Sequence, residues 1–156
     1  MEGTHPLIYK VDATDGKTVN KTCFLKIFRK ESTTPYNLET TAYEYLRNAG
    51  IEYYIHQVYG RGYRTVASWG FEEIEGDGDE DGRYSGILTE WLEGLERGSQ
   101  ENITFEQAPL LVVGLSKIHD EEVLHADICQ DNMVVIPGTS RGVSLHFSVV
   151  KVEHDY

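Results

Sequence analysis

The chain has 156 residues, enough for one ordinary domain with a buried core and too few for two independent catalytic domains. Its 26 acidic residues outnumber 14 lysines and arginines, and the net charge of −12 opposes a long surface that binds nucleic-acid phosphates. No apolar run reaches membrane-spanning length, the first residues lack a secretion signal, and two cysteines make no disulfide framework. We therefore expect a cytoplasmic protein, with the nucleus also open, and neither nucleic acid nor a membrane as its partner.

The first part of the chain reads as strands around one helix. Residues 7–11 and 22–28 are rich in β-forming residues and flank a polar connection with an Asp-Gly pair, which predicts a hairpin. Residues 36–49 have helical spacing and end at a glycine, so we expect a helix there. Residues 64–75 and 84–94 predict two strands of a second hairpin, joined by an acidic, glycine-rich turn. The apolar positions of the helix are Leu38, Ala42, Tyr45 and Leu46.

The second part predicts a helix followed by another hairpin. Residues 104–121 form an amphipathic pattern, and Thr104 is a suitable helix cap. Residues 132–137 and 143–152 are β-rich and flank a turn of small residues. The apolar positions that predict the buried face of this helix are Leu111, Val112, Leu115 and Ile118.

Two groups of residues have side chains of the types that bind metals. The acidic turn places Asp77, Asp79 and Asp81 as in a calcium-binding loop, but Leu88 stands where a bidentate glutamate is needed, so we reject calcium there.

A transition-metal site would have to use His119, His125, Asp127 and Cys129, whose side chains are of the types that share zinc. Neither histidine belongs to a paired metal motif, so packed or hydrogen-bonded histidines are favoured over a structural metal. A nucleophilic role for Cys129 is weaker still, because the sequence shows no activating base beside it.

The segment "LHADICQDN" carries the most informative pattern. His125 and Asp127 are followed by Asn132 and an apolar strand, which resembles the catalytic loop of the protein-kinase-like superfamily, including aminoglycoside and choline phosphotransferases. "FLKIF" places Lys26 like the lysine that contacts the nucleotide, and "LETTAYEYL" places Glu39 on the next helix like its ion-pair partner. The residue patterns of "LHADICQDN" and "LETTAYEYL" look most like those of the divergent kinase-like proteins found in fungi.

The resemblance implies an α+β, protein-kinase-like fold: a small β-rich lobe with one helix and the beginning of a helical large lobe. Residues 1–94 would form the N-terminal lobe with a hinge at 90–94, and residues 95–156 would form a partial C-terminal lobe with the catalytic-loop segment. The large lobe would be incomplete, so we expect the chain to be truncated. The helix at 104–121 would then lack part of its usual cover and expose an apolar patch that suits a protein partner.

The resemblance also implies ATP and Mg²⁺ as ligands. Lys26 would hold the nucleotide phosphates and Glu39 would fix Lys26. Backbone groups of Glu90, Trp91 and Leu92 would meet the adenine base. Because no glycine-rich loop precedes Lys26, we expect weak nucleotide binding.

For catalysis, the resemblance makes Asp127 the base for an acceptor hydroxyl, Asn132 a magnesium ligand and His125 an organiser of the loop. His146 stands where the family's metal-binding aspartate is expected, and a neutral imidazole is a poor ligand for magnesium. We therefore expect a relative of ATP-dependent phosphotransferases with weak or no activity. The alternative is a pseudokinase or truncated binding module that engages a protein partner without catalysis.

Overall fold

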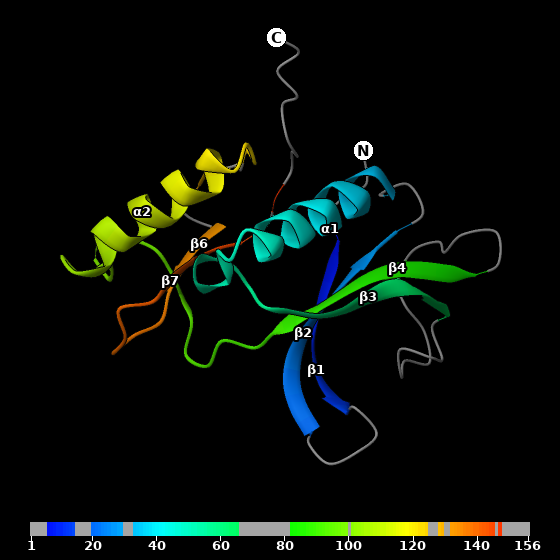
Figure 1. The fold of residues 1–156 in the computed structure, drawn as a ribbon. Coiled ribbons are helices and arrows are strands. Elements are labelled where there is room, and N and C mark those ends of the chain that lie inside the picture. The colour runs from blue at the N-terminus through cyan, green and yellow to red at the C-terminus, as the bar shows by residue number, and fades with distance from the viewer. Residues whose placement is uncertain are drawn as a thin grey trace, which may run out of the picture. The chain divides into compact units, whose positions relative to one another are not determined.

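The computed structural model describes residues 6–14, 20–29, 33–65, 82–99, 101–124, 128–129, 132–145 and 147 (Figure 1). These residues form a mixed α+β fold with two α-helices and two antiparallel sheets, which confirms the predicted α+β class. The chain divides into two compact units, one of residues 1–37 and 58–91 and the other of residues 38–57 and 92–156. In the described part of the chain, no helix is long and apolar enough to cross a membrane.

The first unit contains a four-stranded antiparallel sheet with the order β1-β2-β4-β3 (Figure 1). Strand β1 is Leu7–Thr14 and β2 is Asn20–Phe28, so the predicted first hairpin is confirmed and both strands are longer than expected. Strand β4 is Arg83–Glu90 and pairs with both β2 and β3. Strand β3 is Val58–Thr65, earlier than the strand predicted at 64–75.

Two glycines explain why β3 was missed. Gly60 and Gly62 lie inside the strand, where they interrupt the alternation of β-forming side chains by which a strand is recognised. The pairing of β3 with β4 is irregular between Val58 and Gly60. Most of the predicted strand at 64–75 and the acidic turn after it, including the rejected calcium loop, lie outside the described residues.

Both faces of this sheet pack against apolar side chains, as the period-two alternation of β2 requires. Leu25 and Ile27 form a buried cluster with Tyr84 on one face. On the other face, Phe28 forms a cluster with Tyr36 and Ile87. The rings of Phe28 and Tyr36 meet edge to face with centroids 5.5 Å apart.

Helix α1 is Thr33–Asn48, which confirms the predicted helix with an earlier start. The stop at Gly50 is also confirmed, with φ of +77°. The Gly50 N–H donates to the Arg47 carbonyl at 3.0 Å and the Ile51 N–H donates to the Leu46 carbonyl at 3.1 Å, which is the Schellman ending. One predicted core position is wrong, because Tyr45 is exposed. The buried side chains of this helix include Glu39, Ala42, Tyr43 and Leu46.

The second unit places helix α2, Gln107–Asp120, against a three-stranded sheet with the order β5-β6-β7. Strands β6, Met133–Val135, and β7, Gly142–Ser144, confirm the predicted last hairpin. Strand β5, Glu96–Arg97, and the 3-10 helix η2, Glu52–Tyr54, were not predicted.

The inner face of α2 is closely packed and differs from the predicted one. Leu111 and Ile118 are buried as expected, but Val112 is exposed. Gln107 and Gly114 complete the buried stripe. A side chain at Gly114 would meet the Tyr54 ring, so a glycine is what lets η2 approach the helix.

Candidate functional site

Lys26 lies on the central strand β2, where it pairs with Ile8 on one side and Ile87 on the other. Its side chain is half-buried, and its ammonium nitrogen lies 5.2 Å from the centroid of the Phe28 ring. Ile8 is 63% exposed on the neighbouring strand. Lys26 and the exposed Ile8 side chain therefore lie next to each other on the same face of the sheet.

Glu39 lies on helix α1, in the part that belongs to the second unit. Its side chain is only 2% exposed, although a carboxylate is among the costliest groups to bury. A carboxylate in such a place needs hydrogen-bond donors or a cation to remain ionised. Such burial is unusual for an ordinary surface residue of an amphipathic helix, and it marks Glu39 as a candidate functional residue.

The segment predicted to meet the adenine base begins at the end of β4. Glu90 is the last residue of that strand and is half-buried. The centroids of the Trp91 and Phe24 rings lie 4.5 Å apart, and the Lys10 ammonium nitrogen lies 4.1 Å from the centroid of the Trp91 ring. Leu92 is buried in the core of the second unit, so only its backbone remains for a ligand.

Asn132 directly precedes β6 and is half-buried. Its carbonyl accepts a hydrogen bond from the Leu145 N–H at 2.8 Å, and its own N–H donates to the Cys129 carbonyl at 3.1 Å. Leu145 is the residue before His146 in the sequence. The β6–β7 ladder therefore brings together Asn132 and the chain that leads to His146.

The other predicted catalytic positions, His125, Asp127 and His146, lie outside the described residues. His119 and Cys129, two of the four residues of the candidate zinc site, are both exposed. Among the residues that the structure describes, no three His, Cys, Asp or Glu side chains are grouped so that they could hold a metal ion.

A contact that sequence reasoning missed links helix α1 to the segment after β7. The rings of Tyr43 and Phe147 meet edge to face, with centroids 5.3 Å apart and an interplanar angle of 86°. Both side chains are buried. Tyr43 lies one helical turn after Glu39, and Phe147 follows His146. The pair therefore packs Phe147 against the helix that carries Glu39.

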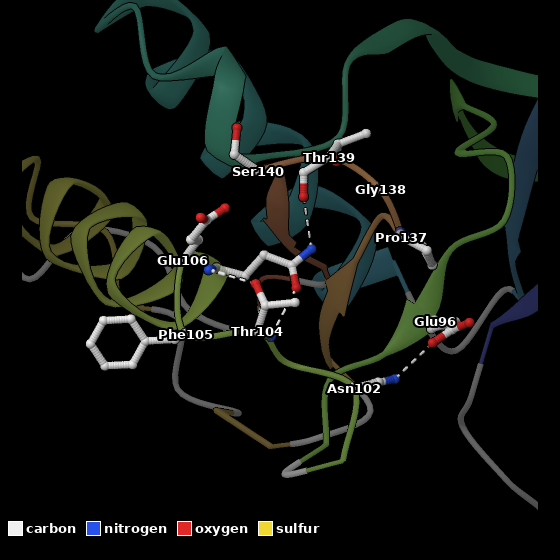
Figure 2. Close-up of a pocket in the computed structure, with 10 residues that line it drawn as sticks. Glu96, Asn102, Thr104, Phe105, Glu106, Pro137, Gly138, Thr139 and Ser140 are labelled. Atoms are coloured by element: carbon white, nitrogen blue, oxygen red, sulfur yellow. Dashed lines mark hydrogen bonds between the residues drawn. The ribbon is translucent and has the colours of Figure 1, made fainter.

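The second unit also contains an open hollow of about 680 Å³, shown in Figure 2. Of the residues that the structure describes, none predicted to bind nucleotide or metal lines it. Its lining comes from β5, the segment between β5 and α2, the start of α2 and the β6–β7 turn: Glu96, Asn102, Thr104, Phe105, Glu106, Gln107, Pro137, Gly138, Thr139 and Ser140.

Gln107 is the polar centre of this hollow. Its Oε1 accepts from the Thr104 N–H and its own N–H donates to Thr104 Oγ1, both at 3.1 Å, so the predicted cap is confirmed as a reciprocal capping box. The Gln107 Nε2 donates to the carbonyls of Thr139 at 2.9 Å and Ile136 at 3.3 Å. The side chain thus uses both its donor and its acceptor atoms within the protein, which makes it structural.

Comparison with known proteins gives no family assignment. No family model matches the chain, and no curated protein matches it. The kinase-like resemblance therefore depends on the motifs of the sequence.

Proposed function

We propose that this chain is a kinase-like domain, related to ATP-dependent phosphotransferases that act on a hydroxyl acceptor, with little or no turnover of its own. The contact between Tyr43 and Phe147 carries the proposal. In protein kinases, the packing of the phenylalanine that follows the metal-binding aspartate distinguishes active from inactive states. Phe147 follows His146, at the position that corresponds by resemblance, and it packs on the helix that carries Glu39.

The burial of Glu39 supports the same proposal. A kinase needs an ion pair between the lysine of a central strand and a glutamate of the following helix. Lys26 is on a central strand and Glu39 is a buried carboxylate on the next helix. We propose that Lys26 and Glu39 have the roles that the resemblance gives them, and that the kinase-like lobes divide near residue 94.

Nucleotide would bind along the face of the sheet that carries Lys26. Its phosphates would approach the Lys26 ammonium, and its base would lie toward the backbone of residues 90–92. Binding would be weak, with a dissociation constant on the order of 1 mM, because the phosphates lack a glycine-rich cradle.

Low turnover follows from the metal position. Asn132 would supply one oxygen ligand to magnesium, and Asp127 would orient the acceptor hydroxyl. His146 would offer nitrogen to a cation that prefers oxygen, so magnesium would be held poorly. Without the metal, the charge that develops on the transferred phosphoryl group is not neutralised.

Titration of ATP with and without magnesium tests the binding site. Lys26→Ala should abolish saturable binding, whereas Lys21→Ala, on the same strand but exposed, should leave it unchanged. Glu39→Gln, which keeps the shape and removes the charge, should weaken binding through Lys26. Absence of binding at several millimolar ATP, or equal loss in both lysine variants, would refute the nucleotide site.

Turnover is tested separately with phosphotransfer and ATP-hydrolysis assays on the unaltered chain, Asp127→Ala and His146→Asp. We expect no turnover in the unaltered chain, and we expect His146→Asp to gain magnesium-dependent binding. Turnover that Asp127→Ala abolishes would show that the chain is an active enzyme.

A second candidate function is a binding module without catalysis. The exposed apolar face of α2 favours it, because Phe105 is 94% exposed and Val112 is 64% exposed. Exposed apolar side chains gathered on one helix face are typical of surfaces that bind proteins. A chain that binds no nucleotide but has a partner on this face would favour this function over the kinase-like one.

A further inference from the structure

Helix α2 has an outer face that is apolar and exposed. Opposite its buried stripe, Val112 and Val113 are 64% and 42% exposed, and Phe105, two residues before the helix begins, is 94% exposed. Ala108, Pro109 and Ser116 are exposed beside them. Figure 2 shows the Phe105 ring projecting away from the β6–β7 hairpin. The outer face is defined by Phe105, Ala108, Pro109, Val112, Val113 and Ser116.

This face carries no charge along most of its length. Residues 107–116 contain no Asp, Glu, Lys or Arg, although such residues make up 26% of the chain. Charged residues are depleted at the centres of protein interfaces, where they would lose their hydration. A solvated helix face in so acidic a chain would ordinarily carry carboxylates, so the outer face has the composition of an interface.

Opposite charges stand at the two ends of the outer face. Glu106 lies at the start of the helix and Lys117 in its last turn, and both are exposed. They are separated by eleven positions, about 16 Å along the helix axis. Val112 lies almost midway between them.

The charges of Glu106 and Lys117 make the outer face complementary to the same face of a second copy. If a second copy packs antiparallel about a two-fold axis near Val112, Glu106 of each copy faces Lys117 of the other. A parallel arrangement would instead bring two Glu106 side chains together and two Lys117 side chains together. An isologous interface requires such a self-complementary patch. We propose that the outer face of α2 is the interface of a homodimer, with the two α2 helices antiparallel.

The size of the face sets the expected affinity. A helix of 14 residues is about 21 Å long, so a single helix pair buries less than the ~1,200 Å² of a standard stable interface. The dimer should therefore be weak, with a dissociation constant on the order of 100 μM. Two copies of charge −12 repel each other, but at physiological salt this repulsion is screened beyond about 8 Å. The proposal does not depend on nucleotide binding.

Sedimentation equilibrium of the full chain in physiological salt, from about 10 μM to 1 mM, tests the dimer across the expected dissociation constant. Val112→Glu should make the chain monomeric at every concentration, because the two-fold axis brings the two new carboxylates together. The valine is exposed and glutamate is a good helix former, so the helix itself should persist. An unchanged far-UV circular dichroism spectrum checks this.

A charge-swap cycle tests the antiparallel pairing. Glu106→Lys and Lys117→Glu should each raise the dissociation constant about tenfold, since each turns two attractive pairs into two repulsive ones. The double variant restores the original net charge and should return the constant to within about threefold of the unaltered value. Glu52→Lys, on the exposed η2 helix, makes the same charge change as Glu106→Lys and should have little effect.

A chain that stays monomeric at 1 mM would overturn the proposal, and so would a dimer that Val112→Glu leaves intact. Failure of the double charge variant to recover would overturn the antiparallel arrangement. A monomeric chain whose outer face binds a different protein would show that the occupant is not a second copy.

Discussion

Gln107 joins helix α2 to the β6–β7 turn, and its removal measures how firmly they are joined. Its side chain bonds with Thr104 at the start of the helix and donates to the carbonyls of Ile136 and Thr139. It is 2% exposed. Gln107→Ala therefore removes the partner of one N–H at the helix start and of two carbonyl oxygens.

The expected cost can be estimated from these bonds. Loss of the reciprocal cap costs about 1 kcal/mol. Loss of a hydrogen bond to each carbonyl costs about 0.5–1.5 kcal/mol, and we take the lower end because Thr139 is exposed and water can replace part of the interaction. The free energy of unfolding should fall by about 2 kcal/mol for Gln107→Ala, but by only about 1 kcal/mol for Thr104→Ala.

Urea denaturation followed by far-UV circular dichroism, together with hydrogen exchange of the α2 amides, measures this cost. Exchange protection of α2 should fall about 30-fold in Gln107→Ala. Gln107→Glu is the matched control: it keeps the acceptor for the Thr104 N–H but cannot donate to the two carbonyls when ionised. Equal losses in Gln107→Ala and Thr104→Ala would refute the reasoning, because the bonds to the turn would then contribute nothing.

Three further predictions concern packing and protonation. Phe147→Ala should cost about 3–5 kcal/mol, and a double-mutant cycle of Tyr43→Leu and Phe147→Leu should give a coupling of about 0.5–1.5 kcal/mol; additive losses would exclude a direct ring contact. Gly114→Ala should destabilise by about 1 kcal/mol despite its better helix propensity, because the new Cβ would lie 2.7 Å from Tyr54 Cδ1. In a Tyr54→Ala background the same change should stabilise, and stabilisation in both backgrounds would contradict the close approach. Burial raises the pKa of the Cys23 thiol above its usual 9.0. The protonated thiol therefore contributes fully to the free energy of unfolding below the unfolded-state pKa, and this contribution is lost as the pH rises through the folded-state pKa. The stability difference between the unaltered chain and Cys23→Ala should therefore shrink above pH 9, and a constant difference would contradict it.

Several elements were predictable because their causes are local in the sequence. The first hairpin follows from β-forming runs around a polar connection with an Asp-Gly pair, a signal carried by residues close in the sequence. The end of α1 at Gly50 and the cap at Thr104 depend on hydrogen bonds between residues at most five apart. For the candidate site, the motifs predicted which residues to consider, and the roles of Lys26, Glu39 and Asn132 stay proposals.

Other features were decided by tertiary contacts. Periodicity predicted that α1 and α2 each have an apolar face. In each helix, however, more than one set of positions spaced three or four residues apart contains apolar side chains, and contacts with the neighbouring elements determine which set is buried. Tyr43 is buried and Tyr45 exposed because Phe147, distant in sequence, packs on the former.

In helix α2, too, helical periodicity alone does not determine which residues are buried. Its buried stripe includes Gln107 because two carbonyls of the β6–β7 turn accept its amide hydrogens. It includes Gly114 because the Tyr54 ring occupies the space where a side chain would lie. A polar residue and a glycine are weak signals of burial in a sequence, so their burial depends on partners brought close by the fold. Val112 is exposed because the buried side of α2 is the side that carries Gln107, Leu111, Gly114 and Ile118.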